Sequence, residues 1–423
     1  MTKSSTKESR GPVLGINSLG RIGKLSLWHH VGRKYFKEIV VNLGRDVGTG
    51  MDTIARLIET DATYGLLHRF LYGYKAQPCV QITDDKNGKM IIDGIPVTIL
   101  REERNPLNIP WRQYGADIVV DCSGNFKDPT VPVDDKKGSI RGHLNGGAKV
   151  VIHSAPFKIK NKALSTPDDT TTLIYGINHT AFDRKKHLLV SAASCTTTGL
   201  AHMVKPLLDN EETSTILTAS MSTIHAVTNT QSVLDKMPKA GEKDIRKTRS
   251  ILNNIILTST GAAKALIDVI PEVKNIGFMG DSIRVPTNTL SLIVLNATFQ
   301  ARPNGKGDAA NIDTKKLNEI YQKVAQNNPL VRFTMQQNVS TDLIGEDAAV
   351  IIEGQFNHTR TAFIPVDLSH IPNLPAGFLQ TIGEKTLQVP VVHAKIFGWY
   401  DNEYGSYTNR LGDLTVYVHK NIQ

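Results

Sequence analysis

A glycine-rich turn near the start of the chain, GINSLGRIG at residues 15–23, constrains the fold more than any other feature. It follows a short apolar run and opens an amphipathic segment, which is the setting of the G-x-G-x-x-G dinucleotide-binding fingerprint. The three fingerprint positions are occupied by Ser18, Gly20 and Gly23. Gly20 permits close approach of a pyrophosphate to the backbone, and Gly23 lets the helix pack on the strand. Ser18 requires a turn whose backbone avoids a glycine-only conformation at that position.

The first third of the chain alternates between strand-like and helix-like segments. Residues 13–17 and 38–43 are apolar runs of strand length, and residues 21–31 between them have a helical pattern. Further apolar runs lie at residues 117–122 and 149–152. Strand, helix and strand in about thirty residues form a βαβ unit, whose helix N-terminus can bind an anion. Since 423 residues suffice for two cores, we expect an α/β protein of two domains.

Composition and charge exclude several classes of protein. The net charge is +9, but the basic residues are scattered and no RRM, KH or zinc-finger signature occurs, so nucleic acid is an unexpected partner. No Cys-x-x-Cys or His-x-x-x-His spacing predicts a metal site. No apolar run reaches the roughly 18 residues of a membrane span. The polar opening MTKSSTKESR lacks a secretory signal, which predicts a cytoplasmic protein.

The segment SAASCTTTGLAHMVKPLL, residues 191–208, places a lone cysteine just before an amphipathic helix. Residues 196–198 are threonines that can cap this helix, and its unpaired N–H groups stabilise a negative charge. Such a position lowers the pKa of a thiol and makes a thiolate nucleophile available near neutral pH. Cys195 is therefore a candidate nucleophile, although a buried structural cysteine fits the same local pattern.

A histidine follows about thirty residues later. His225 ends the run TILTASMSTIH, where a histidine in a strand is either a core residue or a general base. Two further segments carry polar groups typical of anion and cofactor sites. They are residues 256–291, with TSTGAAKA and DSIRVPTNT, and residues 397–414, with FGWYDNEYGSYTNRLGDL.

Taken together and in this order, these segments resemble the phosphorylating glyceraldehyde-3-phosphate dehydrogenase family over residues 15–414. The resemblance implies an NAD(P)-binding Rossmann domain at residues 1–194, to which residues 402–423 return. A mixed α/β catalytic domain would then span residues 195–401. It also implies a homotetramer that takes glyceraldehyde 3-phosphate and inorganic phosphate as substrates.

The resemblance also assigns catalytic roles. Cys195 matches the nucleophile of the family and His225 matches its base. Thr228 and Arg284 match the pocket for the phosphate of the substrate. The pocket for the attacking phosphate is matched by Ser194, Thr196, Thr260 and Gly261.

Cofactor contacts carry over in the same way, to Asn17, Gly20, Arg21, Ile22, Arg104, Ser154 and Asn402. The choice between NAD and NADP stays open. An acidic residue at the end of the second strand binds the adenine ribose in NAD-dependent relatives. An ungapped alignment puts Gly44 there with Arg45 next, which suits a 2′-phosphate, whereas a gap of two residues puts Asp46 there.

The chain departs from the family pattern at three places. Gly199 replaces the second cysteine of the motif C-T-T-N-C, and Thr198 replaces its asparagine. The extra residue Ser406 shifts the aromatic side chain beside the nicotinamide to Tyr407. Residues 365–390, with four prolines, have no counterpart, and we expect either a surface loop or an added subunit contact.

Two other functions share much of this pattern. An erythrose-4-phosphate dehydrogenase would keep most of the same residues. A non-enzymatic nucleotide-binding or RNA-binding relative would not need both Cys195 and His225.

Overall fold

The computed structural model describes residues 11–301, 312–375 and 377–423, so the polar N-terminal segment lies outside the described residues. The chain divides into two compact units. Unit 1 comprises Met1–Thr198 with Glu403–Gln423, and unit 2 comprises Gly199–Asn402. The sequence prediction put these divisions at 194/195 and 401/402. The first division at Thr198 falls inside one continuous helix, α6 (Cys195–Asp209).

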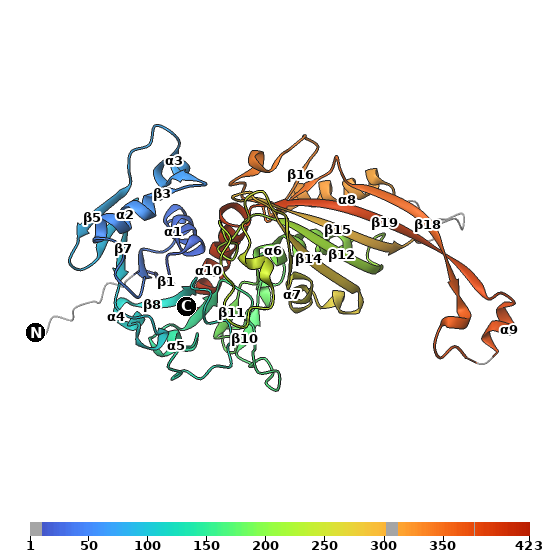
Figure 1. Cartoon of the computed structure of the whole chain (residues 1–423), viewed down its shortest axis with the longest axis horizontal. Helices are drawn as coiled ribbons and strands as arrows, with labels where there is room; N and C mark the ends of the chain where they lie inside the picture. Colours follow the sequence, from blue (N-terminus) through green and yellow to red (C-terminus); the bar gives the residue numbers. More distant parts are fainter. Residues whose placement is uncertain (1–10, 302–311, 376) are drawn as a thin grey trace, which may run out of the picture. The chain divides into compact units, whose positions relative to one another are not determined.

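Unit 1 is built on a nine-stranded sheet (Figure 1). Its central strands are parallel and nearly all their residues are buried, as expected for a sheet covered on both faces. At one edge, β6 runs antiparallel to both of its neighbours, β5 and β7, whereas β7 is parallel to β2. In spatial order the strands are β10 (Thr170–Thr172), β11 (Leu189–Ser191), β9 (Val150–His153), β8 (Ala116–Asp121), β1 (Val13–Asn17), β2 (Glu38–Asn42), β7 (Ile95–Leu100), β6 (Lys89–Ile92) and β5 (Val80–Asp84).

The predicted βαβ unit is confirmed. Strand β1 has the predicted bounds, and β2 ends one residue earlier than predicted. Helix α1 (Arg21–Arg33) continues two residues further, until Lys34 adopts a left-handed conformation and ends it. The other helices of unit 1 are α2 (Met51–Glu59), α3 (Leu67–Tyr72), α4 (Trp111–Tyr114), α5 (Gly142–Asn145) and α10 (Asn409–Ile422), beside the small ribbon β3 (Thr60–Asp61) and β4 (Gly65–Leu66).

Unit 2 contains an eight-stranded, mostly antiparallel sheet. Buried and partly exposed residues alternate along β15 and β19, so one face of the sheet forms the core. The helices of this unit are α7 (Ala262–Val269), α8 (Thr314–Asn327), α9 (Phe378–Ile382) and most of α6. The strands are β13 (Ile256–Ser259), β14 (Gly277–Arg284), β12 (Ile216–His225), β15 (Ser291–Gln300), β19 (Thr386–Tyr400), β17 (Val350–Glu353) and β16 (Val331–Thr334), with β18 (His358–Asp367) paired to β19.

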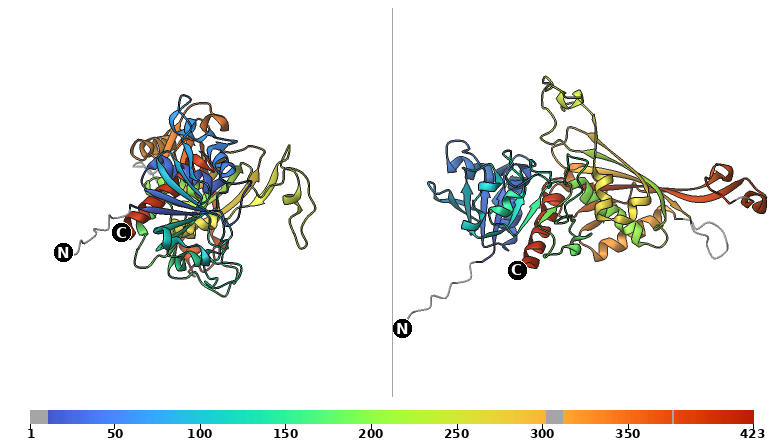
Figure 2. Two further views of the ribbon diagram at one scale, coloured as in Figure 1. Left: turned by 90° about the vertical axis from the view of Figure 1, so that its left-hand side faces the viewer. Right: turned by 90° about the horizontal axis from the view of Figure 1, so that it is seen from below.

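The segment at residues 365–390, for which either a surface loop or an added subunit contact was expected, lies in a long β-hairpin. β18 pairs with β19 over ten residue pairs, from His358↔Lys395 to Asp367↔Thr386. β15 pairs only with residues 391–400 of β19, so the hairpin continues past the sheet as a two-stranded ribbon (Figures 1 and 2). Prolines are tolerated there because edge strands and ribbons leave N–H positions unpaired.

No helix in the described ranges has the length and apolarity needed to cross a bilayer.

Candidate active site

The glycine-rich turn between β1 and α1 is strained at its first position. Ser18 has a φ of 81°, a conformation that favours glycine, so the expectation of an ordinary backbone there was wrong. Its N–H donates to Asn42 O at 2.8 Å. A Cβ on Gly23 would lie 2.0 Å from Ser18 O, so only glycine fits where the helix meets the turn. The N-terminus of α1 has no side-chain cap, and its first N–H groups are open to an anion.

A buried polar network lies where β1, β8 and β9 end. Asp121 accepts from Asn17 Nδ2 at 2.8 Å and contacts His143 Nε2 at 3.0 Å and His153 Nδ1 at 3.4 Å. Trp111 Nε1 donates to His143 Nδ1, which places the proton of this imidazole on Nε2. Burial alone would raise the pKa of Asp121, but the two histidines outweigh burial and hold it well below its usual range. The network fixes Asn17, one of the predicted cofactor residues.

A cavity of about 950 Å³ opens beside this network, large enough for a small-molecule ligand. Four predicted cofactor residues line it: Asn17, Gly44, Arg45 and Arg104. Arg104 Nε donates to Gly44 O at 3.2 Å, which joins the loop after β7 to the loop after β2. The cavity is also lined by loops that follow β8 and β9.

The two candidates for the ribose-binding position differ in their surroundings. Gly44 has a φ of 64°, and a Cβ there would lie 2.9 Å from Glu103 O and 3.0 Å from Arg104 Cγ. The Asp46 side chain is 89% exposed, lies 3.7 Å from Arg101 and does not line the cavity. Of the two candidates, Gly44 lines the cavity and Asp46 does not.

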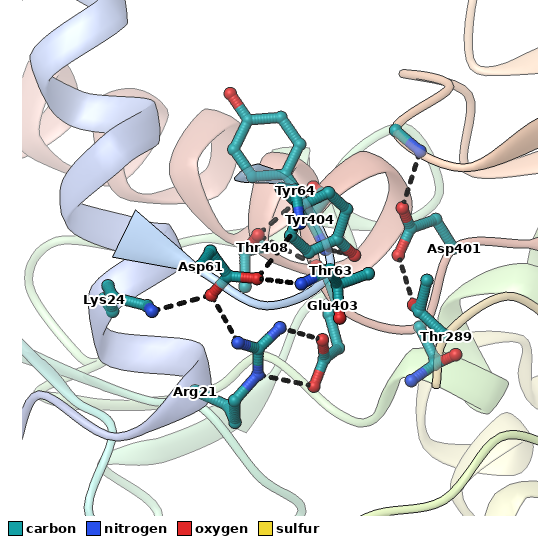
Figure 3. Close-up of polar contacts among 12 residues, drawn as sticks. Arg21, Lys24, Asp61, Thr63, Tyr64, Thr289, Asp401, Glu403, Tyr404 and Thr408 are labelled. Carbon is teal, nitrogen blue, oxygen red and sulfur yellow. Dashed lines mark hydrogen bonds and ion pairs between the residues drawn. The ribbon is translucent and has the colours of Figure 1, made fainter. Parts of the chain in front are cut away.

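Arg21, another predicted cofactor residue, is engaged by carboxylates (Figure 3). Its guanidinium pairs with both oxygens of Glu403 and with Asp61, which also binds Lys24 Nζ at 2.6 Å. Burial would raise the pKa of Asp61, but Lys24, the Thr63 N–H and Arg21 lower it to about 2. The Arg21 side chain therefore ties the returning C-terminal segment to α1, and only its backbone position suits the cofactor. Ile22 follows it in the first turn of α1.

Cys195 is the first residue of α6 and is partly exposed. The cap of this helix is Ser194, whose Oγ accepts from Thr197 N–H at 3.1 Å. The prediction that residues 196–198 cap the helix was wrong, because these threonines form its first turn, with Thr196 buried. Ala193 has a φ of 54°, so the strand makes a sharp, strained turn into the helix at the cysteine.

The extra residue Ser406 lies in a π-helical turn, η7 (Tyr404–Thr408), at the start of α10. One inserted residue in a helix commonly produces such a turn, frequently at functional sites. Tyr404 turns toward α1 and stacks on His29, with 3.9 Å between ring centres. Tyr407 OH donates to Ala193 O at 3.3 Å, so the second tyrosine lies against the turn before Cys195.

His225 and Arg284 end the adjacent parallel strands β12 and β14 and are register partners. His225 Nδ1 lies 2.8 Å from Arg284 Nη1 and 2.7 Å from Ala226 O. Burial and the Arg284 charge lower the pKa of His225 to about 4, so the imidazole is neutral at pH 7. A neutral imidazole is the form that can accept a proton.

The remaining predicted residues are distributed over both units. In unit 2, Thr228 OH donates to Gln231 Oε1 at 3.0 Å, and Asn402 Oδ1 accepts from Ser291 OH at 3.0 Å. Thr260 and Gly261 follow β13, whose register pairs Ser259 with Asp281, so they lie about four to five residues, roughly 13–17 Å, along β14 from Arg284. In unit 1, Ser154 N–H donates to Asp121 O at 2.9 Å.

Sequence reasoning missed the Asp121 network and the lysines of the cavity. An acidic residue ending the apolar run DIVVDC and a histidine ending KVVIH were the available signals. The lysines gave no local signal, because they come from separate loops. Gly199 lies in a tightly packed position, where a Cβ would be 3.2 Å from Ile293 Cδ1 and 3.4 Å from Tyr400 Cγ. Across the residues that the structure describes, no group of His, Cys, Asp and Glu forms a metal site.

Comparison with known proteins identifies the family of the chain. Residues 13–129 match the family model of the glyceraldehyde 3-phosphate dehydrogenase NAD binding domain, and residues 194–366 match the model of its C-terminal domain. A glyceraldehyde-3-phosphate dehydrogenase of Streptomyces coelicolor is 32% identical over 96% of this chain and 98% of its own length. One from Trichormus variabilis is 33% identical over 95% of each chain, and one from Bacillus cereus is 29% identical over 96% and 98%. The chain thus belongs to the glyceraldehyde-3-phosphate dehydrogenase family of oxidoreductases, as its sequence motifs predicted.

Proposed function

We propose that the protein oxidises D-glyceraldehyde 3-phosphate and phosphorylates the product to 1,3-bisphosphoglycerate, with NAD or NADP. The observation that carries the proposal is Cys195 as the first residue of the Ser194-capped helix α6. A cysteine at a helix N-terminus is stabilised as thiolate, the form that attacks an aldehyde. The cofactor fits unit 1 for two reasons. The N-terminus of α1 has no side-chain cap, so its N–H groups can bind a pyrophosphate. Gly44 lines the cavity without a side chain, and a Cβ there would lie 2.9 Å from Glu103 O.

In the proposed reaction, Cys195 Sγ attacks the aldehyde carbon and forms a hemithioacetal. His225, neutral near pH 7, accepts the hydroxyl proton as the carbon is oxidised. The nicotinamide, when bound, supplies the hydride acceptor. N–H groups of the first turn of α6 stabilise the oxyanion that develops. Attack of inorganic phosphate on the thioester gives the acyl phosphate and releases the Cys195 thiolate.

Two anion sites are required for this reaction. We assign the substrate phosphate to Thr228 and Arg284, because a guanidinium offers a forked set of donors to phosphate. We assign the attacking phosphate to Ser194, Thr196, Thr260 and Gly261. The separation of Thr260 from Arg284 along β14 supports two distinct anion sites.

The experiment that tests this function is a steady-state assay with glyceraldehyde 3-phosphate, in which inorganic phosphate, NAD and NADP are varied independently. We expect reduced cofactor to form only when phosphate is present. Erythrose 4-phosphate is assayed in parallel, and a higher kcat/KM for it would identify the other dehydrogenase. Absence of turnover with both aldehydes would contradict an enzymatic role.

We also propose that the protein is a homotetramer. Large apolar side chains of unit 2 are exposed, including Leu257, Met279 and Val233. Exposed apolar patches of this kind mark interaction surfaces. Light scattering on purified protein tests the assembly, and a monomeric mass would contradict it.

A further inference from the structure

The cavity of unit 1 carries a concentration of positive charge that the proposed reaction does not use. Lys127, Lys136 and Lys137 come from the loop after β8, and Lys158 and Lys160 come from the loop after β9. We call these five residues the lysine lobe. None of the five ammonium groups forms a salt bridge with a carboxylate of the described residues.

The two carboxylates that line the same part of the cavity are already engaged by the backbone. Asp128 Oδ1 accepts from Thr130 N–H at 3.0 Å and Asp128 Oδ2 accepts from Lys160 N–H at 2.9 Å. Asp135 Oδ1 accepts from Lys137 N–H at 2.7 Å. These carboxylates shape the loops, and they leave the lysine lobe with an excess of positive charge.

The loops that carry the lysines are held in place by hydrogen bonds. Lys158 N–H donates to Lys127 O at 2.8 Å, which joins the loop after β9 to the loop after β8. Arg141 pairs with both oxygens of Asp169, at 2.7 and 2.8 Å, and its Nε donates to Pro129 O. Because the backbone is fixed before a ligand arrives, little ordering cost remains for binding.

The position that would face the adenosine ribose carries no carboxylate in this cavity. A carboxylate at the end of β2 would accept the ribose hydroxyls of NAD and repel a phosphate. Gly44 has no side chain, and its contacts with Glu103 O and Arg104 Cγ leave no room for one. Asp46 points into solvent and lies outside the cavity lining. Arg45 and Arg104 line the cavity instead and add two positive charges.

We propose that the lysine lobe is a subsite for a phosphate monoester on the adenosine ribose, so that the protein binds NADP in preference to NAD. The inference rests on the proposed function, since it names the cofactor of the same site. The lysines line the same cavity as Asn17 and Gly44. We therefore infer that the phosphate bound by the lysines is part of the dinucleotide that occupies this cavity. A phosphate monoester needs several donors and a local positive potential, and the lobe supplies both.

Calorimetric titration of the full-length protein tests the subsite directly. The ligands are NADP, NAD, 2′,5′-ADP, 5′-AMP and inorganic phosphate. We expect NADP to bind about 10–100-fold more tightly than NAD, because NAD lacks the phosphate that would accept charge-assisted hydrogen bonds from the lysines. The same ratio is expected between 2′,5′-ADP and 5′-AMP, and it should shrink as salt is raised.

The variant K158M/K160M removes two ammonium groups and keeps most of the apolar length of each side chain. We expect it to weaken NADP and 2′,5′-ADP by about tenfold or more, while NAD changes by less than about twofold. The matched control is K185M/K186M, which removes the same charge from an exposed turn outside the cavity. The control should bind both cofactors as the wild type does.

Equal affinity of the wild type for NAD and NADP would overturn the proposal, as would an equal loss for both cofactors in K158M/K160M. Tight binding of inorganic phosphate without a preference for 2′,5′-ADP over 5′-AMP would also overturn it, because the lobe would then hold a free anion. These titrations contain no aldehyde. A protein that selects NADP but does not oxidise glyceraldehyde 3-phosphate would therefore contradict the proposed reaction alone.

Discussion

At the scale of single residues, Cys195 carries the chemistry that we propose, because it begins α6 with Ser194 as its cap. We expect Cys195→Ser to abolish aldehyde oxidation and to leave cofactor binding nearly unchanged, since a serine hydroxyl is far less ionised than a thiol. Steady-state assays and cofactor titration measure the two effects. Retention of more than about a tenth of wild-type turnover, a loss below about 1.4 kcal/mol, would contradict covalent catalysis at this residue.

His225, the base that we propose, is a buried histidine whose pKa is lowered by burial and by the Arg284 charge. We expect His225→Asn to slow hydride transfer by roughly 10²–10⁴-fold, the usual contribution of a positioned base. Single-turnover measurement of cofactor reduction isolates this step. A histidine elsewhere on the surface of unit 2, His370, provides the control, and His370→Asn should leave the rate unchanged.

The same histidine should make folding sensitive to acid. Its folded pKa of about 4 lies below its unfolded value of 6.5, so the unfolded chain takes up a proton that the folded chain does not. The free energy of unfolding therefore falls as the pH falls from about 6.5 to about 4. Urea titrations at several pH values should show a shallower fall in His225→Asn than in the wild type.

Ser18 shows how a tight turn can store strain. Its φ of 81° costs a non-glycine residue on the order of 1–2 kcal/mol. Ser18→Gly removes this strain, but glycine loses more conformational entropy on folding, which offsets part of the gain. We therefore expect the substitution to raise the free energy of unfolding by up to about 1 kcal/mol. Ser165→Gly is a control at an exposed serine that is not among the positive-φ residues, and it should not stabilise the protein. A destabilised Ser18→Gly would mean that the hydroxyl matters more than the backbone.

At the scale of elements, the ion-pair cluster around Asp61 joins α1, the β3–β4 ribbon and the start of the C-terminal segment. The Asp61 side chain is fully buried, and its Oδ1 accepts from Thr63 N–H and Tyr64 N–H. We expect Asp61→Asn to lower the free energy of unfolding by about 1–3 kcal/mol, since two cations lose a partner. Glu102→Gln, an exposed charge change, is the control, and an equal effect in both variants would contradict the role of the cluster.

The π-helical turn η7 accommodates the extra residue at the start of α10. Thr408 N–H donates to Glu403 O at 2.8 Å, a bond that spans five residues and takes up the extra length of Ser406. The insertion is therefore confined to one turn, and α10 keeps its buried face against unit 1. Tyr407 reaches the Ala193 turn as a result.

At the scale of the whole molecule, the β18–β19 ribbon extends beyond the part of β19 that pairs with β15. Phe363 and Ile364 are neighbours that point to opposite faces of the ribbon, yet they are 61% and 43% exposed. A two-stranded ribbon is only marginally stable in water, and apolar side chains on both faces favour a protein contact. We therefore favour the subunit-contact interpretation of residues 365–390.

The double variant F363K/I364K tests that interpretation. We expect it to lower the assembled mass measured by light scattering, because two charges would be buried at the contact. Glu384→Lys changes charge in the same ribbon without adding to its apolar faces, and it should leave the mass unchanged. An unaltered mass in F363K/I364K would identify the ribbon as a surface projection.

Features with local signals can be predicted from the sequence alone. Strand β1, helix α1 and strand β2 follow from apolar periodicity and a glycine turn within thirty residues. The position of Cys195 at a helix start could be predicted because a helix N-terminus is also a local feature. The ribbon at residues 365–390 was missed because its prolines predict a loop unless the pairing partner is known.

The interaction partners of the site residues depend on tertiary packing. Arg21 meets carboxylates 40 and 382 positions away, and Asn17 meets Asp121 across 104 positions. His225 and Arg284 become neighbours through strand register, and the lysine lobe combines two loops in one cavity. Such contacts depend on how parallel strands are ordered and aligned, and that order is set by burial of the whole core. No window of the sequence contains this information, because each charge receives its partner only when distant segments pack together.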